Sequence, residues 1–281
     1  MRTVDLHTVS DVIAADADAW RPGDRWLAGG SYLFSQPQPG VRRLRDLTRL
    51  RWPSIRIDYD GLEIAATCTV AELARFAPPP GWNRVTELVA GCCDAFLASR
   101  KIWNVATVGG NICAALPAGP MTSLAVATRA EYLLTDLAGG QRRVPADGFI
   151  RDVGATVLDA GEYLRSVRLP AAAARARYAM RRASLFRHGR SAALVIGSVD
   201  QDTGGWTMSV TAATRRPVVL SLPAAPTGPE LLDRVDAGCA AAGWVDDVHG
   251  LPRWRRHRTL RMAEQVRAEL ATAGADGEDG R

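Results

Sequence analysis

Residues 25–33 read Arg-Trp-Leu-Ala-Gly-Gly-Ser-Tyr-Leu, and residues 103–112 read Trp-Asn-Val-Ala-Thr-Val-Gly-Gly-Asn-Ile. Each segment places a glycine pair directly after a β-like run and carries a hydroxyl side chain, Ser31 or Thr107. Because glycine has no Cβ and readily adopts left-handed φ angles, successive backbone N–H groups of such a loop can point at one anion. The two loops therefore predict a cradle for the two phosphates of a dinucleotide. A Rossmann site is disfavoured, since the chain has no G-x-G-x-x-G run.

The elements predicted around these loops are those of a mixed α and β chain without a regular βαβ array. Apolar and polar residues alternate on either side of Asp60-Gly61, which predicts a β-hairpin with a type I′ turn. Thr69-Val-Ala-Glu72 has the pattern of a capping box that starts a helix. Cys92 lies at helical spacing from Leu88 and Phe96 and is expected in the core. The remaining predicted elements are helices over 4–20, 83–99, 229–242 and 253–272, a hairpin over 132–145, and strands over 25–28, 192–200, 206–214 and 217–222.

Composition disfavours several classes of function. The chain has 281 residues, of which 47% are apolar and 23% charged, as in an ordinary globular protein. Lys101 is the single lysine among 35 basic residues and lies outside any G-x-x-x-x-G-K loop, so Schiff-base and P-loop chemistry are disfavoured. The net charge of +5 is divided among short arginine clusters, so no nucleic-acid binding is expected. Glycine and proline interrupt the longest uncharged run, 105–128, so no membrane span is expected.

The cysteine and histidine residues predict neither a metal site nor a disulfide framework. The five cysteines contain no CxxC pair, and the four histidines show no ligand spacing. Cys113, directly after the second loop, is expected to be a structural residue rather than a reactive thiol. Reduced thiols, together with an amino terminus that lacks an apolar signal core, predict a cytoplasmic protein.

The quoted segments resemble those of the FAD-binding (medium) subunits of the molybdenum hydroxylases, the group of carbon monoxide, xanthine and nicotinate dehydrogenases. Residues 27–33 are similar to the A-G-G-x-x-L phosphate loop of that family. Residues 103–112 are similar to its R-N-x-A-T-x-G-G-N-I loop, about 80 residues further along. Residues 161–170 resemble the end of the flavin domain, and a closing helix carries Arg-Arg-His-Arg around His257. The resemblance extends to about Ala271.

The resemblance implies a set of FAD-binding positions. The first loop would run along the pyrophosphate, and the second would complete the cradle and reach the ribityl chain and the flavin. Leu97 and Leu164 fall where the family has apolar residues near the ring. Arg181 falls where many members have a lysine, whose charge could stabilise the reduced flavin. The implied cofactor-binding residues are Ala28, Gly29, Gly30, Ser31, Tyr32, Leu33, Phe34, Ser35, Leu97, Thr107, Val108, Gly109, Gly110, Asn111, Leu164 and Arg181, with no catalytic side chain and no metal ligand.

Three positions depart from the family pattern. Residues 117–120, Pro-Ala-Gly-Pro, lack the acidic residue that the family often uses to bond the FAD ribose. Trp103 stands where arginine is common, and Arg181 replaces the lysine, which changes the geometry of the cation. Because both glycine loops are intact, we expect a subfamily that binds FAD rather than a degenerate site.

The implied fold is α+β. A two-part PCMH-type FAD-binding domain would cover 1–171, with subdomains of about 1–54 and 55–171. A small carbon monoxide dehydrogenase flavoprotein C-terminal domain over 172–272 would combine an antiparallel sheet with helices, and 273–281 are predicted to be a disordered tail.

The implied function is that of an electron-transfer subunit of a hetero-oligomeric oxidoreductase. Electrons would arrive from two [2Fe–2S] clusters in a small partner subunit and leave through FAD to an external electron acceptor. A large partner subunit would bind the molybdopterin cofactor and hydroxylate the substrate. Two alternatives remain open: a flavin-less assembly subunit of the same complex, and a stand-alone FAD oxidase of the vanillyl-alcohol-oxidase type. The substrate and the acceptor do not follow from this chain.

Overall fold

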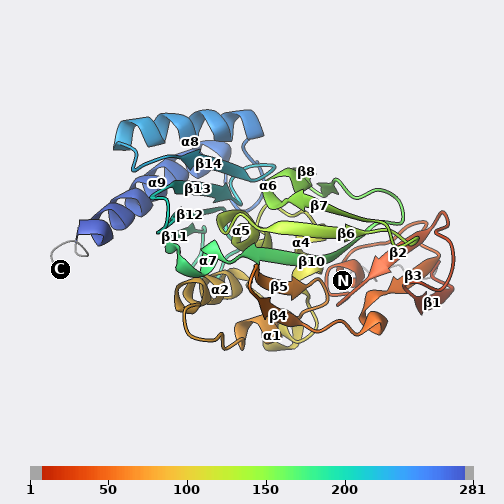
Figure 1. The fold of residues 1–281 in the computed structure, drawn as a ribbon. Coiled ribbons are helices and arrows are strands. Elements are labelled where there is room, and N and C mark those ends of the chain that lie inside the picture. Colours follow the sequence, from red (N-terminus) through yellow and green to blue (C-terminus); the bar gives the residue numbers. More distant parts are fainter. Residues whose placement is uncertain (1–7, 276–281) are drawn as a thin grey trace.

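A computed structural model describes residues 8–275, and its strands form three main sheets (Figure 1). The first is a small parallel sheet in the order β1-β3-β2, at the right of Figure 1. The first glycine pair follows β2 directly, so the predicted strand at 25–28 is confirmed. The elements of this part are β1 (Asp11–Ala14), β2 (Asp24–Leu27), the 3₁₀ turn η1 (Leu33–Ser35), β3 (Arg43–Asp46) and the 3₁₀ turn η2 (Leu47–Leu50).

The second sheet has five antiparallel strands in the order β4-β5-β10-β6-β7, so its last strand in sequence lies in the centre. Leu62 and Ile64 of β5 are fully buried and flank the partly exposed Glu63, which is the period-two pattern of a strand. The elements of this part are β4 (Ile55–Asp58), β5 (Gly61–Ala65), α1 (Val70–Ala74), α2 (Asn83–Ala95), α3 (Arg100–Trp103), α4 (Val108–Cys113), α5 (Pro120–Ala127), β6 (Glu131–Thr135), β7 (Gln141–Pro145), α6 (Ala146–Phe149), β8 (Ile150–Asp152), β9 (Ala155–Thr156) and β10 (Tyr163–Pro170).

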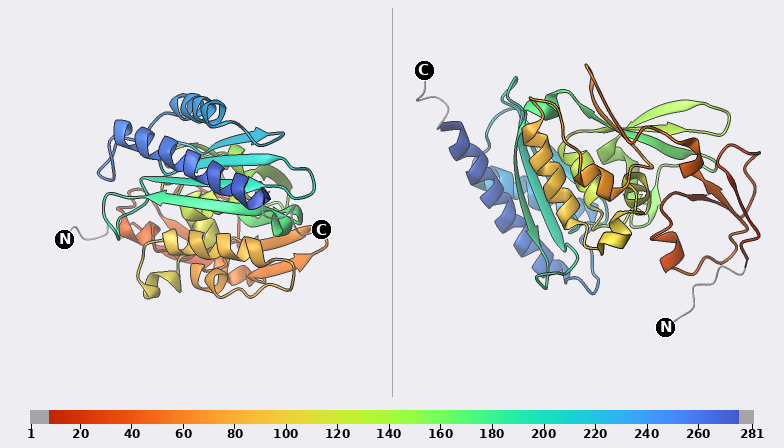
Figure 2. Two further views of the ribbon diagram at one scale, coloured as in Figure 1. Left: turned by 90° about the vertical axis from the view of Figure 1, so that its left-hand side faces the viewer. Right: turned by 90° about the horizontal axis from the view of Figure 1, so that it is seen from below.

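The third sheet is an antiparallel meander, β11-β12-β13-β14, with α9 on one face and α2 on the other (Figure 2, right). Every residue of β12 is buried because both faces of this strand are covered. None of the helices between residues 8 and 275 combines the length and apolarity that crossing a membrane requires. The elements of this part are α7 (Ala172–Arg175), β11 (Arg177–Ala183), β12 (Ala193–Val199), β13 (Trp206–Thr211), β14 (Val218–Leu222), α8 (Gly228–Ala242) and α9 (Pro252–Ala275).

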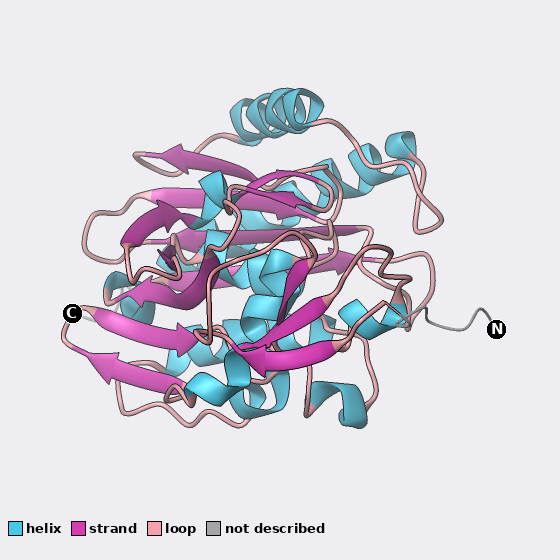
Figure 3. Cartoon of the chain, turned by 90° about the vertical axis from the view of Figure 1, so that its right-hand side faces the viewer, coloured by secondary structure: helices cyan, strands magenta, loops and turns pink. Residues whose placement is uncertain are grey.

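The predicted α+β class is confirmed, and Figure 3 shows the molecule from the side of the small parallel sheet, with both helices and strands throughout. The capping box at Thr69 is present, with both of its reciprocal hydrogen bonds. The predicted helix over 4–20 is wrong over 8–20, none of which is helical: β-branched Val12 and Ile13 pair with β3 as a strand, and a turn follows. Residues 4–7 lie outside the described part of the chain. In the predicted tail, 273–275 belong to α9, and 276–281 are outside the described residues.

The predicted hairpin over 55–66 is confirmed, but its turn differs from the prediction. Asp58 pairs with Gly61, so the turn residues are Tyr59 and Asp60, and neither has the positive φ of a type I′ turn. The Asp58 carboxylate accepts hydrogen bonds from the amides of Asp60 and Gly61 and stabilises the turn. Gly61 serves a different purpose, because a Cβ there would lie 2.0 Å from the Leu169 carbonyl oxygen of the neighbouring strand.

Candidate cofactor site

The two glycine segments lie against each other. A Cβ added to Gly29 would lie 1.6 Å from the carbonyl oxygen of Val105, a distance that real Cβ atoms do not adopt. The first loop therefore packs on the backbone that leads into the second loop, and only glycine permits this contact. This close approach brings together the two segments that the sequence predicts to form one cradle.

The first loop presents a row of free backbone donors. Gly30 has a left-handed φ of +67° and turns the chain after β2. The amides of Phe34 and Ser35 bond back to Gly30 and Tyr32, closing the short turn η1. Within the described residues, however, the amides of Gly30, Ser31 and Tyr32 have no hydrogen-bond acceptor. Consecutive free N–H groups beside a left-handed residue form an anion-binding concavity.

The second loop uses its amides inside the protein. Val108 N–H donates to the Cys68 carbonyl at 2.8 Å, and Gly109 N–H donates to the Ala66 carbonyl at 2.9 Å. Gly110 N–H donates to the Oγ1 of Thr107, which caps α4. The expectation that both loops offer free amides is therefore not met at these three positions. The second loop instead contributes an exposed glycine, Gly110, where a Cβ would lie 2.9 Å from the Thr107 Oγ1 that caps α4.

Asn111, next to Gly110, connects the second loop to α5. Its Oδ1 accepts a hydrogen bond from the Met121 amide at 3.0 Å. The N-cap residue of α5 is Gly119, which has no side chain, so Asn111 caps this helix from another segment. Pro120, which stands where relatives often have an acidic residue, occupies the first turn of α5, where a proline loses no helical hydrogen bond.

Trp103, the second departure from the family pattern, is a core residue. Its ring is 7% exposed, and its Nε1 donates to the Phe96 carbonyl at 3.1 Å. The Arg100 guanidinium lies 4.5 Å from the ring centroid. The indole thus packs between α2 and α3 with its polar atom satisfied, and it does not project over the glycine loops.

Three further predicted positions, Leu97, Leu164 and Arg181, differ in their surroundings. Leu97 is exposed after the end of α2, whereas Leu164 is a 2% exposed core residue of β10. Arg181 forms an ion pair with Glu269 of α9. Neighbouring residues of a strand face opposite sides, and Met180 packs on Gly91 of α2. Arg181 therefore lies on the α9 face of the third sheet and is not brought to the loops.

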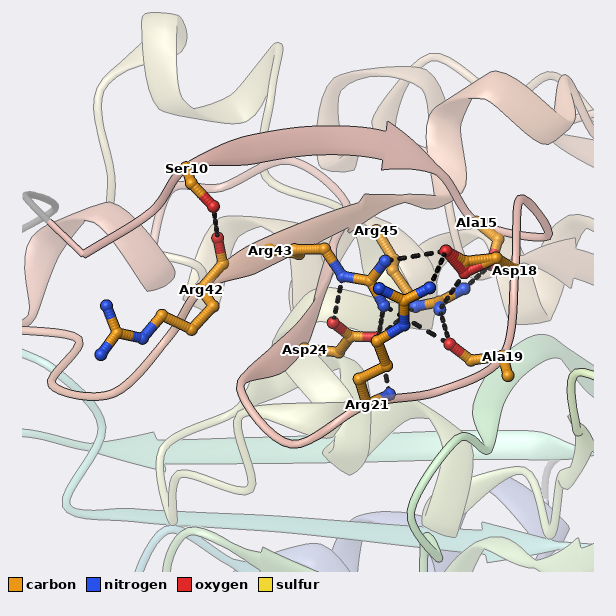
Figure 4. Close-up of polar contacts among 9 residues, drawn as sticks. All are labelled: Ser10, Ala15, Asp18, Ala19, Arg21, Asp24, Arg42, Arg43 and Arg45. Atoms are coloured by element: carbon orange, nitrogen blue, oxygen red, sulfur yellow. Dashed lines mark hydrogen bonds and ion pairs between the residues drawn. The ribbon is translucent and has the colours of Figure 1, made fainter.

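A buried ionic cluster supports β2, the strand before the first loop (Figure 4). The Asp24 carboxylate accepts from Nε of Arg43 and Nε of Arg45, each at 2.7 Å. Arg45 is fully buried and also donates to the carbonyls of Ala15 and Ala19. Burial alone would raise the pKa of Asp24, but the hydrogen bonds from the two arginines outweigh it and lower the pKa to about 2. The sequence signal for this cluster is the alternating Arg43-Leu-Arg45 in a strand, which the sequence prediction missed.

The thiol behind the second loop, Cys113, is held in its protonated form. Burial raises the pKa of Cys113 to about 12, so this thiol is protonated at neutral pH. All five cysteines are free, and burial raises the pKa of the other four thiols as well.

The donor set of the cradle fits the phosphates of a dinucleotide. Three unpaired amides in sequence supply neutral donors beside the left-handed Gly30. No charged side chain is needed to explain anion binding at such a loop. The residues present therefore match a pyrophosphate, whereas the flavin end of the cofactor would contact side chains beyond the two loops.

Comparison with known proteins gives a consistent result. Residues 2–172 match the family described as the FAD binding domain in molybdopterin dehydrogenase. Xanthine dehydrogenase 1 of Arabidopsis thaliana is 31% identical over 123 residues, which cover 42% of this chain and 9% of that protein. The carbon monoxide dehydrogenase medium chain of Hydrogenophaga pseudoflava is 29% identical over 153 residues, which cover 52% of this chain and 50% of that protein. The matched segments thus span half or less of these curated relatives.

Solved structures share the fold over nearly the whole chain. A carbon monoxide dehydrogenase from Hydrogenophaga pseudoflava that lacks the Mo-pyranopterin moiety superposes with a TM-score of 0.78 at 21% identity, over 92% of this chain and 95% of that chain. Quinoline 2-oxidoreductase from Pseudomonas putida 86 superposes with a TM-score of 0.75 at 19% identity, over 97% and 99%. At these identities the superpositions establish the fold.

Proposed function

Because the chain belongs to the family of FAD-binding domains of molybdopterin dehydrogenases, we propose that it is the flavoprotein subunit of a molybdenum hydroxylase complex. In this proposal a small subunit with two [2Fe–2S] clusters delivers electrons, and a large subunit with the molybdopterin cofactor hydroxylates the substrate. The electrons leave to an external acceptor. The observation that carries the proposal is the row of unpaired amides at Gly30, Ser31 and Tyr32, held in place by the Gly29–Val105 contact.

The residues of this chain bind and orient the cofactor. The three free amides would donate hydrogen bonds to the pyrophosphate, while Gly110 leaves the space that the phosphates need. Tyr32 and Phe34 are both partly exposed and flank the loop, where their rings would limit the access of water. FAD, when bound, supplies the electron-transfer chemistry, so no side-chain nucleophile or general base is required.

A substitution of Gly110 tests the cofactor site. In Gly110→Ala the new methyl group would enter the cradle, and within the protein it would meet the Thr107 hydroxyl at 2.9 Å, which a small shift of that side chain relieves. We expect the purified variant to lose most of its FAD, measured by flavin absorbance, while its unfolding temperature stays near that of the wild type. Gly148→Ala is the matched control, because nothing lies within 4 Å of a Cβ at that helical glycine. A Gly110→Val variant that retains full FAD would show that the loop does not hold the phosphates.

Co-purification tests the partners. We expect the tagged chain to bring down a large molybdopterin-binding chain and a small cysteine-rich chain. A yellow chain that oxidises a substrate without partners would favour a stand-alone oxidase instead. A colourless chain that cannot be reconstituted with FAD would favour the flavin-less assembly subunit. The proposal includes a cytoplasmic location, which the five free cysteines support.

A further inference from the structure

A cavity that is partly open to solvent lies between the FAD-binding part and the third sheet, away from the glycine loops. Its volume is about 550 Å³, within the usual range for small-molecule sites. Strand β10 separates the two places: its first residue, Tyr163, packs on Trp26 beside the first loop, and its last residue, Pro170, lines the cavity. At about 3.3 Å per residue, this strand spans roughly 25 Å.

The wall of the cavity formed by the third sheet carries a row of hydroxyl groups. Tyr178, Ser198, Thr207 and Ser221 are register partners on β11, β12, β13 and β14, and all four line the cavity. Residues directly opposite one another on antiparallel strands point to the same face of a sheet, so the four side chains form one line across it. This row does not belong to the cofactor site described above.

Two hydroxyl groups of the row have no partner within the protein. Tyr178 donates to the Ala173 carbonyl at 2.8 Å, and Ser221 accepts from Arg129 at 3.0 Å. Ser198 and Thr207 are 8% and 7% exposed as residues and line the cavity, and within the described residues neither hydroxyl bonds to another protein group. Both oxygens are reached from the cavity, so they are free to bond to a ligand that enters it.

Arg129 places a cation at one end of the row. It follows α5 with a left-handed φ of +54°, as the residue after a helix C-cap often does: its amide bonds to the Val126 carbonyl, and the Ala130 amide bonds to the Ala125 carbonyl. One guanidinium nitrogen donates to Ser221, and among the described residues the others have no acceptor. Asp200, two residues beyond Ser198, adds a carboxylate to the lining, and one of its oxygens accepts the amides of 202 and 203.

We propose that this cavity binds a small hydroxylated carboxylate. The ligand's carboxylate pairs with Arg129, and its hydroxyl groups bond to Ser198 and Thr207. Its carbon atoms rest on the apolar part of the lining, which includes Ala172 and Leu222. A purely apolar ligand would leave the two hydroxyls unpaired. A polyanion such as a nucleotide is disfavoured, because a single arginine cannot neutralise several negative charges and the nearby Asp200 carboxylate would repel them.

Titration of the full-length chain with L-malate, citrate and D-gluconate, followed by calorimetry, tests the site. We expect at least one of the three acids to bind. Acetate, which has no hydroxyl group, and glycerol, which has no carboxylate, are expected to bind at least tenfold more weakly. Arg129→Gln and Thr207→Val are each expected to weaken binding of that acid at least tenfold. Arg143→Gln and Thr272→Val are the matched controls, because both residues are exposed and lie outside the lining of the cavity.

The measurement is independent of the cofactor site. FAD content is expected to be unchanged in Arg129→Gln and Thr207→Val, so loss of the acid with flavin retained supports this proposal specifically. Ser198→Ala, which removes a single hydroxyl, is expected to weaken binding in the same direction and guards against misfolding of the larger change. The proposal is overturned if none of the three acids binds the wild type at millimolar concentration. It is also overturned if folded Arg129→Gln and Thr207→Val bind the acid as tightly as the wild type.

Discussion

The α-carbon of Gly29 faces the carbonyl oxygen of Val105 so closely that a Cβ would lie 1.6 Å from it. In Gly29→Ala the two glycine segments must therefore separate. Overpacking against backbone that cannot rotate away costs about 3 kcal/mol or more. We expect the variant to unfold at a clearly lower denaturant concentration and to lose FAD, in contrast to Gly110→Ala, which should lose FAD alone. Equal stability of Gly29→Ala and Gly148→Ala in urea titrations would contradict this contact.

Acid should weaken the ionic cluster of Asp24. The pKa of Asp24 is lowered from 3.8 to about 2, so its contribution to stability is fully present above about pH 4 and is lost as the pH falls toward 2. A shift of this size corresponds to about 2 kcal/mol. Asp24→Asn leaves the buried Arg45 without its hydrogen-bonded carboxylate and leaves Arg43 with Asp18 alone, so we expect urea unfolding at pH 7 to show a marked destabilisation. The gap between variant and wild type should narrow near pH 2.5; a gap independent of pH would rule out the cluster as its source.

Arg181 provides a negative prediction. Since its guanidinium pairs with Glu269 on the α9 face, Arg181→Ala should leave the FAD content and the flavin reduction potential unchanged. Exposed ion pairs of this kind add little to stability, so the unfolding temperature should also change little. Glu269→Ala is the control for loss of the pair. If Arg181→Ala changes the flavin reduction potential and Glu269→Ala does not, Arg181 acts on the cofactor after all.

Cys113 should resist alkylation in the folded protein. Burial raises its pKa to about 12, so at pH 8 nearly all of this thiol is protonated and unreactive. Iodoacetamide treatment followed by mass spectrometry should find Cys113 unmodified in the native chain and modified in urea. Rapid modification of the native protein would show an accessible thiolate beside the second loop.

The two glycine loops were predictable from sequence, but which of them keeps free backbone amides was not. A Gly-Gly pair after a β-like run indicates a loop that can approach an anion. Which amides remain free depends on acceptors elsewhere in the chain: the carbonyls of Ala66 and Cys68 consume those of Gly109 and Val108. Those acceptors lie about 40 residues earlier in the chain, so no local sequence pattern predicts these hydrogen bonds.

Several strands were missed for related reasons. Arg43–Asp46 looks polar because two of its four residues are arginines, yet Arg45 is buried against Asp24, which lies on a different strand. Arg177–Ala183 also contains three arginines, and its direction in the sheet decides that Arg181 faces α9. A family motif can match a residue to a position in sequence, but the side of a strand on which it lies follows from tertiary pairing.

Strand β10 has a consequence for the order of events during synthesis. The β4-β5 and β6-β7 hairpins are local and can form as they leave the ribosome, but β10 is the strand that joins them, since it pairs with β5 on one side and β6 on the other. The indole of Trp26 also donates to the carbonyl of Glu162, at the start of the same strand. A nascent chain that ends before residue 163 therefore contains both glycine segments. It lacks β10, the strand that joins the two hairpins into one sheet. Cofactor capture must follow translation of the whole FAD-binding part.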